Sequence, residues 1–387
     1  MSMISQRIPP QLTAPLFEVC DRLEVPPVAT YAGVCLWNYK PIFPDQPADN
    51  LSNLACLQTF TGSLDEQWFY LISVAIEARG APSIPLMLQA ITAARMGKTR
   101  VVTECLQRFA EILDEITSLL LRLYENCDQY VFYNRIRPYL AGSKNMIDAG
   151  LPRGLLYDDG RNPPEYRQYG GGSNAQSSLI QFFDIVLGVE HRPTGVTRQD
   201  QSTTADSPKS RNGFIHEMRA YMPGSHRRFL EDVDSIANIR SFVEERRNDP
   251  ALRLAYDACL SMLRNMRDKH IQMVSRYIIV QARGARQASQ SGQPIRGMNL
   301  STAVPSDSKK LRGTGGTALI PFLKQARDET REPVIDAWAR RLLSNAPGVV
   351  DSASLSKVGE QPDGHLEVVG LCGTWTADDS EGGICHW

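Results

Sequence analysis

Residues 249–284 read DPALRLAYDACLSMLRNMRDKHIQMVSRYIIVQARG. This stretch decides the fold because it predicts one long, partly buried helix. Asp249 can cap its start, and Pro250 suits the first helical position, where a missing N–H costs nothing. Gly284 suits a left-handed C-terminal stop. A buried stripe is predicted by apolar residues that repeat at helical spacing, namely Leu263, Met266, Val274 and Tyr277.

His270 lies on this stripe, four residues after Met266, so its side chain should point inward. An inward imidazole on a rigid helix suits an axial ligand of haem iron. A core histidine that hydrogen-bonds to a neighbouring carbonyl fits the same position and is the commoner arrangement. Arg267 lies on nearly the same face, where it can reach a propionate at the edge of a haem. The helix alone leaves both interpretations open.

Composition predicts a globular protein that is not built for nucleic acid or membranes. The 387 residues can form a large core in one or two domains, and 42 basic and 43 acidic residues give a net charge of −1. No apolar run approaches the ~18 residues that span a bilayer. The N-terminal MSMISQRIPPQLTAP lacks a hydrophobic signal core, so we expect a cytoplasmic protein. The eight cysteines form neither a disulfide framework nor a CxxC zinc site.

Helical periodicity dominates the rest of the chain, and we predict an all-α fold. A helical domain should cover residues 1–345, with mobile polar loops at about 191–212 and 285–316, and 346–387 should be an irregular tail. We expect Ser83 to cap one helix, Ser173 and Gln176 to form a capping box at another, and Gly188 to end it. Helices are expected at 64–79, 83–97, 99–126, 132–140, 173–188, 213–221, 223–231, 235–247 and 317–343.

Two glycine-rich segments allow more than one interpretation. YGGGS (169–173) can be a turn before a helix cap, but three glycines would also let the backbone approach a flat cofactor or ligand closely. GTGGT (313–317) lacks the Lys-Ser/Thr of a phosphate loop. It is either a plain helix start or the hinge of a lid.

Arg137 lies among aromatic residues in FYNRIRPYLAG. It can be a surface arginine with a packed stem, or a clamp for a carboxylate beside an aromatic wall. Phe69, Tyr70 and Ser73 share one helix face, which is either plain core or the wall of a site. The remaining histidines are weaker ligand candidates, and no Ser/His/Asp or HExxH spacing supports a hydrolase or zinc enzyme; they are His191, His216, His226, His365 and His386.

Seven segments, in this order along the chain, closely resemble the haem domain of indoleamine 2,3-dioxygenase. They are EVPPVATYAGVCLWNY, WFYLISVAIEA, FYNRIRPYLAG, GGSNAQSSLIQFFDIVLG, MRAYMPGSHRRFL, LRLAYDACLSMLRNMRDKHIQMVSRYI and GTGGTALIPFLK. The resemblance covers most of residues 20–325 and implies the helical haem-binding fold of the indoleamine/tryptophan 2,3-dioxygenases.

The resemblance implies a role for individual positions. His270 matches the proximal haem ligand, Arg267 the arginine that pairs with a propionate, and Thr314 the lid threonine over the substrate amino group. Arg137 matches the arginine that binds the substrate carboxylate, and Phe132 the aromatic packed on the indole. Beside the haem the resemblance places Gly172, Ser173, Ile180 and Asp184. The indole pocket would comprise Tyr31, Val34, Cys35, Phe69, Tyr70 and Ser73.

The implied activity is cleavage of the indole C2–C3 bond of L-tryptophan by O2, giving N-formylkynurenine, as in tryptophan catabolism through the kynurenine pathway. It implies one haem b per chain, O2 as co-substrate, an electron donor that keeps the iron ferrous, and a monomer. Three alternatives remain: a haem-binding sensor without turnover, a helical scaffold without cofactor, and a variant dioxygenase acting on another indole in secondary metabolism.

The sequence departs from the family pattern in three places. Members usually carry a smaller helical domain before the segment that aligns with residue 20, and little precedes it here. Tyr70 stands where an apolar aromatic is common, and Asn174 where a small residue is common. Both are expected to add polar groups near the substrate and to alter selectivity among indoles.

Overall fold

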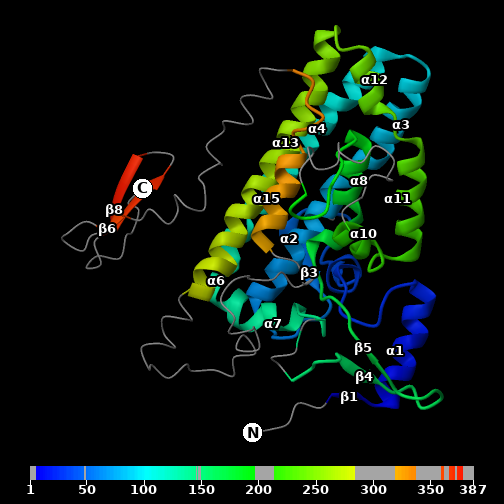
Figure 1. Ribbon diagram of the computed structural model, residues 1–387, viewed down its shortest axis with the longest axis vertical. Helices are drawn as coiled ribbons and strands as arrows, with labels where there is room; N and C mark the ends of the chain where they lie inside the picture. The colour runs from blue at the N-terminus through cyan, green and yellow to red at the C-terminus, as the bar shows by residue number, and fades with distance from the viewer. Residues whose placement is uncertain are drawn as a thin grey trace. The chain divides into compact units, whose positions relative to one another are not determined.

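The computed structural model describes residues 6–47, 49–144, 146, 150–196, 213–283 and 319–336, and the strands at 359–360, 366–370 and 373–377. The chain divides into two compact units, Met1–Ile335 and Asp336–Trp387. Helices dominate the first unit, which confirms the all-α prediction (Figure 1). Thr314 and GTGGT lie outside the described residues, as do 197–212 and all of 285–316.

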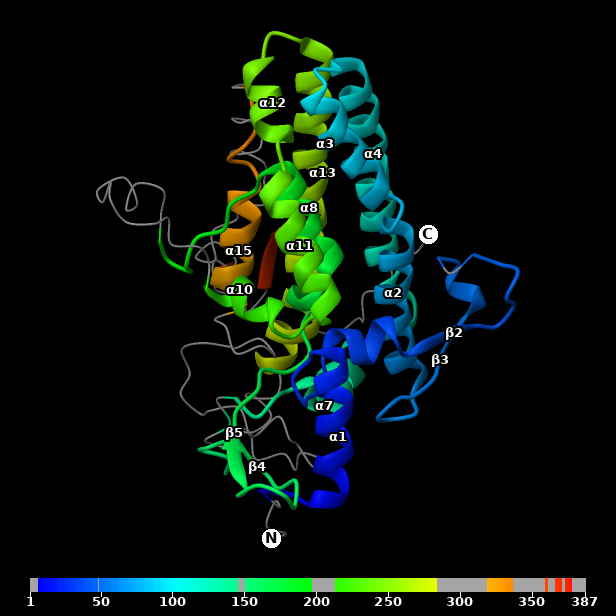
Figure 2. The same ribbon diagram turned by 90° about the vertical axis from the view of Figure 1, so that its right-hand side faces the viewer.

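Helix α13 (Pro250–Val274) is the central helix of the first unit. Asp249 caps it as expected, because its carboxylate accepts hydrogen bonds from the backbone N–H groups of Ala251 and Leu252. The helices α4 (Thr99–Leu121) and α15 (Leu319–Glu329) lie alongside it (Figures 1 and 2). The predicted stripe is buried: Leu263, Met266, Val274 and Tyr277.

The described residues form ten further α-helices around this core. The predicted helix at 99–126 is broken at Arg122, and the last helix ends at Glu329 instead of 343. The α-helices are α1 (Pro10–Leu23), α2 (Leu64–Gly80), α3 (Ser83–Arg95), α5 (Leu123–Asn126), α6 (Gln129–Val131), α7 (Arg137–Leu140), α8 (Ser178–Leu187), α10 (Gly213–Arg219), α11 (Gly224–Ile236) and α12 (Ile239–Glu245).

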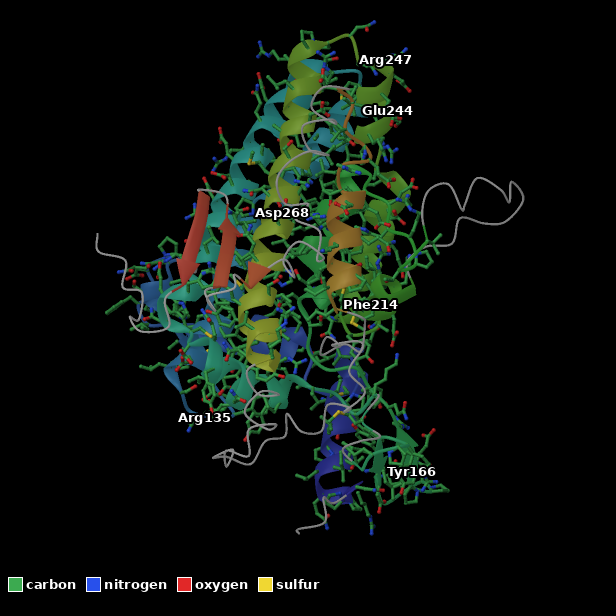
Figure 3. The ribbon with its side chains drawn as sticks, turned by 60° about the vertical axis from the view of Figure 1, so that its left-hand side comes forward. Arg135, Tyr166, Phe214, Glu244, Arg247 and Asp268 are labelled. Atoms are coloured by element: carbon green, nitrogen blue, oxygen red, sulfur yellow. The ribbon has the colours of Figure 1, made fainter. Side chains whose placement is uncertain are left out.

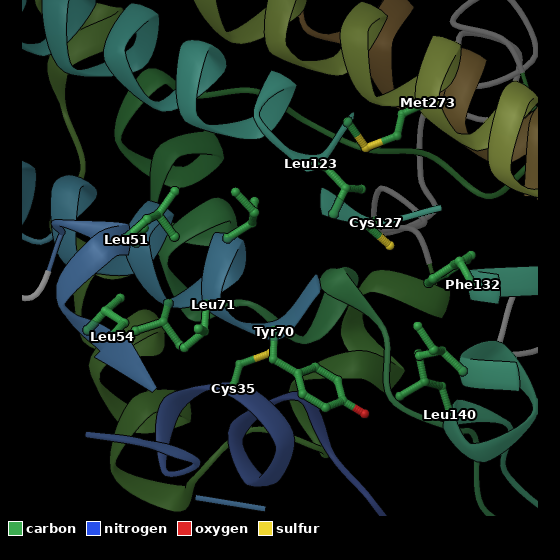
Figure 4. Close-up of a cluster of buried hydrophobic side chains, with 14 of the residues drawn as sticks. Cys35, Leu51, Leu54, Tyr70, Leu71, Leu123, Cys127, Phe132, Leu140 and Met273 are labelled. Carbon is green, nitrogen blue, oxygen red and sulfur yellow. The ribbon is translucent and has the colours of Figure 1, made fainter. Parts of the chain in front are cut away.

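Three π-helical segments interrupt this pattern: η1 (Ala32–Leu36), η3 (Phe132–Ile136) and η6 (Ser275–Val280). The last of them continues α13, so the predicted long helix changes its hydrogen bonding after Val274. π-Helical turns are frequent at functional sites. All three contribute to one buried apolar cluster with α2, α5 and α7. Figure 4 shows part of this cluster, including Cys35 of η1 and Phe132 of η3. Full burial of each large apolar side chain there contributes about 1.5–3 kcal/mol.

Short strands complete the fold. In the first unit, β1 (Arg7–Ile8) pairs in parallel with β4 (Leu155–Tyr157), which pairs antiparallel with β5 (Glu165–Arg167), and β2 (Tyr39–Pro41) pairs antiparallel with β3 (Leu54–Cys56). The second unit, expected to be irregular, contains an antiparallel sheet of β6 (Gly359–Glu360), β7 (Leu366–Gly370) and β8 (Gly373–Ala377). Gly370 pairs with Gly373, and the alternating LEVVG and GTWTA segments explain this hairpin.

Two predicted helix caps are wrong. Ser83 does not cap α3: its hydroxyl is buried and donates to the carbonyl of Gly80, at the end of α2. Ser173 caps only a short 3₁₀ turn, η5 (Asn174–Gln176), and Ser177 caps α8 by accepting from the N–H of Ile180. Gly188 ends α8 as predicted, with φ of 66°.

The stretch Leu64–Arg95, which contains α2 and α3, is long and apolar enough to cross a membrane by length and composition alone. A count of uninterrupted apolar residues overlooks it because charged residues are scattered through it. The same test is met by helices that pack inside a protein core, and this stretch supplies Leu71, Val74 and Ala75 to the buried cluster. We interpret it as two core helices.

Candidate functional site

The first unit encloses a cavity of ≈ 300 Å³ between α2, α8, α13, α15 and the three π-helical segments. Its wall is mostly apolar, with a few polar groups. The structure brings thirteen predicted site residues together around it: Tyr31, Val34, Cys35, Phe69, Ser73, Phe132, Arg137, Gly172, Ser173, Ile180, Asp184, Arg267 and His270.

His270 lines this cavity from near the C-terminal end of α13. The residue is half-buried, and no hydrogen bond to either ring nitrogen is found among the described residues. The carbonyl-bonded core histidine is therefore not what the described part of the chain shows. Burial and the positive charge of Arg267 lower the pKa of His270 to about 4. The ring is consequently neutral near pH 7 and has a lone pair available for a metal.

Arg267, one turn before His270, is tied to α8. Its guanidinium donates to both carboxylate oxygens of Asp184, at 2.6 and 2.7 Å, and also contacts Thr330 after α15. Burial alone would raise the pKa of Asp184, but the positive charges of Arg267 and His191 hold it below the ordinary value. The cavity thus has one ionic side beside the histidine.

Phe132 lines the cavity as part of a group of packed aromatic rings. Its ring centroid lies 4.8 Å from that of Phe69 and 5.5 Å from that of Tyr277, the latter edge to face. At the α15 side, Phe214 packs edge to face on Phe322, with centroids 5.0 Å apart (Figure 3). Such packing makes a rigid apolar slot that suits a flat aromatic ligand.

Arg137 begins α7 directly after η3 and lines the cavity. Its guanidinium lies 5.6 Å from the ring centroid of Tyr133, and burial lowers its pKa. A guanidinium stays charged in proteins, so this position places a positive charge in a mostly apolar wall. That environment strengthens its attraction for a carboxylate.

The glycines of the YGGGS segment mainly allow two stretches of backbone to pack closely against each other. A Cβ on Gly171 would lie 1.9 Å from the carbonyl oxygen of Leu140 and 2.5 Å from the nitrogen of Gly142. Gly172 is the glycine that lines the cavity, and a Cβ there would meet the carbonyl oxygen of Ala29 at 3.3 Å. Close backbone packing therefore explains Gly171, and only Gly172 is placed to approach a ligand.

Tyr70 is the exception among the predicted wall residues. Its side chain does not line the cavity; it is buried, and its hydroxyl donates to Glu66 at 3.0 Å. Glu66 also accepts from the backbone of Phe60 and Thr61 at the start of α2. The hydroxyl therefore stabilises a helix start and, contrary to the expectation, does not add a polar group to the cavity wall. Asn174 does line the cavity, as expected.

Two polar residues were missed by sequence analysis. Glu77 lies behind the wall, where its carboxylate accepts from the hydroxyls of Tyr31 at 2.9 Å and Ser177 at 2.6 Å. His191, placed in a polar loop from the sequence, is instead a buried residue of the cavity wall beside Asp184. The spacing of residues along the sequence indicates neither role, because the hydrogen-bond partners of Glu77 and His191 lie on other elements. The same holds for Gln176, whose side-chain oxygen accepts from the backbone N–H of Tyr31.

Comparison with known proteins agrees with this geometry. A sequence model of the family described as indoleamine 2,3-dioxygenase matches residues 1–333. Indoleamine 2,3-dioxygenase of Saccharomyces cerevisiae is 39% identical over 335 residues, which cover 84% of this chain and 72% of the yeast protein. A 6-hydroxytryptophan 2,3-dioxygenase of Fusarium equiseti is 38% identical, covering 85% of this chain and 75% of that protein.

A mammalian relative extends the comparison. Indoleamine 2,3-dioxygenase 2 of Mus musculus is 33% identical over 329 residues, which cover 85% of this chain and 73% of the mouse protein. The matched residues include every element that surrounds the cavity. The chain therefore belongs to the indoleamine 2,3-dioxygenase family, whose members are dioxygenases.

Proposed function

We propose that the chain is a haem-dependent dioxygenase that cleaves the indole C2–C3 bond of L-tryptophan with O2 and forms N-formylkynurenine. The observation that carries this proposal is His270, a neutral imidazole without a described hydrogen-bond partner, facing an apolar cavity. A metal ligand must offer an unprotonated nitrogen, and a pKa of about 4 supplies one throughout the neutral range.

The residues around His270 fit a haem b. Arg267 offers a guanidinium for a propionate, although it also pairs with Asp184, and Gly172, Ser173 and Ile180 line the same cavity. A flat, largely apolar macrocycle with two carboxylates matches an apolar cavity that is ionic along one side. His270 would hold the iron from α13.

The substrate side of the cavity fits an aromatic amino acid. Arg137 would bind the carboxylate, and the rings of Phe132, Phe69 and Tyr31 would hold the indole. Ferrous haem, when bound, supplies the site at which O2 is held and activated. The chain orients the indole and excludes water. The C2–C3 bond breaks, and each carbon receives one atom of O2, so the electron donor serves only to keep the iron ferrous.

A second candidate substrate is a hydroxylated indole. The Fusarium relative carries the name 6-hydroxytryptophan 2,3-dioxygenase. The polar side chains of Ser73 and Asn174 line this cavity, where a ring hydroxyl would find hydrogen-bond partners.

The test compares wild-type protein with His270→Ala and Arg137→Ala after loading with haemin and reduction. The wild type should convert tryptophan to N-formylkynurenine. H270A should lose the specific Soret band, and R137A should keep it but raise the KM for tryptophan by roughly 10²-fold, since a charged hydrogen bond contributes about 1.5–3 kcal/mol. A Soret band unchanged in H270A would refute the proposal.

The same experiment decides between the alternatives. A haem sensor would bind haemin through His270 and form no product from any indole. Turnover of 6-hydroxytryptophan in preference to tryptophan would identify the variant dioxygenase. An unchanged KM in R137A would remove the carboxylate clamp without touching the haem assignment.

A further inference from the structure

A buried cluster of charged side chains connects the cavity wall on α8 with the end of α15. Nε2 of His191 is 3.1 Å from a carboxylate oxygen of Asp184 on α8, and Nδ1 is 2.7 Å from a carboxylate oxygen of Glu329 on α15. The side chains of His191, Asp184 and Glu329 are 6%, 10% and 3% exposed. Nearby, Arg192 pairs with Glu332 and its backbone N–H donates to Glu329.

Both ring nitrogens of His191 face carboxylate oxygens, which can only accept. Both nitrogens must therefore donate, and the ring is an imidazolium. The cluster then balances three negative groups with three positive ones. Its members are Asp184, Glu329 and Glu332 on one side and Arg267, Arg192 and His191 on the other.

Arg267 is already heavily engaged. It donates twice to Asp184 and contacts Thr330 and the carbonyl of Ala326. Arg267 can bind an additional anion in the cavity only to the extent that Asp184 does not already occupy its guanidinium. His191 is the other cation on Asp184, so it weakens that competition.

We propose that His191 is a positioning residue for the anion-binding side of the cavity: by donating to Asp184, its imidazolium lets Arg267 also hold a carboxylate of the bound cofactor. This inference rests on the proposed haem site. It assigns to the charge of His191 an effect on the rate at which that site releases its cofactor.

The proposal has a pH signature. Burial lowers the pKa of His191, but Asp184 and Glu329 outweigh it and raise the pKa above its ordinary value, against the opposing charge of Arg267. The ring also lines a second cavity of ≈ 850 Å³, from which it can exchange its proton. Below that pKa the imidazolium is present and the cofactor is held. As pH rises through it, the charge is lost and retention weakens.

The experiment measures the rate at which haemin leaves the ferric protein for an excess of apomyoglobin, between about pH 6 and pH 9. Wild-type release should accelerate with pH. His191→Gln should release haemin roughly 10-fold faster at the low end and show little pH dependence. His226→Gln is the matched control, because His226 is half-buried and bonded to Ser178 of α8 but lies outside the cluster. It should follow the wild type.

Glu329→Gln supplies a second, milder variant, and NMR titration of histidine ring protons in the cofactor-free protein reads His191 directly. E329Q should lower the pKa of His191 and move the acceleration to lower pH. Release from H191Q that matches wild type at every pH, or an unmoved profile in E329Q, would overturn the proposal. A Soret band unaffected by H270A would instead defeat the haem site itself.

Discussion

Glu77 is a half-buried carboxyl group that is connected to the cavity wall only through its neighbours. It lies on α2 and accepts from hydroxyls on two other segments, Tyr31 before η1 and Ser177 at the start of α8. Burial raises its pKa, and the two hydrogen bonds only partly offset this. Glu77 therefore connects the segment before η1 with the start of α8, although its burial disfavours the charged form of the carboxyl group.

Glu77→Gln should make stability less dependent on pH. Because the folded-state pKa is raised, the native wild type keeps a proton that the unfolded chain has lost, so its stability falls as pH rises above the unfolded pKa. The amide oxygen still accepts both hydroxyls but cannot ionise. Urea unfolding at pH 5 and pH 8 should show that the free energy of unfolding of E77Q, relative to the wild type, is higher at pH 8 than at pH 5.

Tyr31→Phe is the companion variant. It removes one hydrogen-bond donor to Glu77 and should cost about 1 kcal/mol in the free energy of unfolding at neutral pH. Equal pH dependence of unfolding in E77Q and the wild type would show that Glu77 is not the buried titrating group.

Individual residues differ in how far the sequence could predict them. His270 follows from the helical stripe, because its position is set by neighbours on the same helix. The roles of Arg137 and Phe132 come only from the family resemblance and stay predictions. His191 and Glu77 were not predictable, because their partners lie on other elements and only the folded chain brings them together.

At the scale of elements, the glycine segment before α8 yields a matched pair of variants. Gly171→Ala would place a methyl group against the backbone at Leu140 and Gly142, which cannot move like a flexible side chain. We expect a loss of about 3 kcal/mol or more in the free energy of unfolding. Gly172→Ala meets only one carbonyl oxygen, at 3.3 Å, and should cost about 1 kcal/mol.

Haemin titration separates the two roles. G172A should fold and bind haemin more weakly, because its new methyl group lies at the cavity wall. G171A should lose structure together with binding. A fully stable G171A would contradict the backbone packing between 140–142 and 169–171.

Helices were predicted best where apolar residues repeat at a single helical spacing along the whole element. The helices α2, α4 and α13 follow from apolar spacing near 3.6 residues. The π-helical segments η1, η3 and η6 were not predicted, because a local change of hydrogen bonding leaves composition and approximate spacing unchanged. Ser173 and Ser177 both satisfy the sequence rule for a helix cap, and only the bonded N–H groups distinguish them.

At the scale of the whole molecule, the described wall of the cavity lies entirely in the first unit. Its last wall residue is Ala326 on α15. Just beyond, Val334 is fully buried and the N–H of Ile335 donates to Asp257 at 2.9 Å. The first unit therefore needs its chain up to 335, and no described wall residue comes from the second unit.

A protein ending at residue 345 should therefore bind haemin as the full chain does, with a free energy of unfolding of the first unit changed by no more than about 0.5 kcal/mol. A protein ending at residue 318 should lose binding, since it lacks α15 with Glu329 and Phe322, and also the Ala326 and Thr330 contacts of Arg267. Haemin titration and urea unfolding of both proteins check this. Weakened binding in the longer protein would mean that residues after 345 contribute to the site.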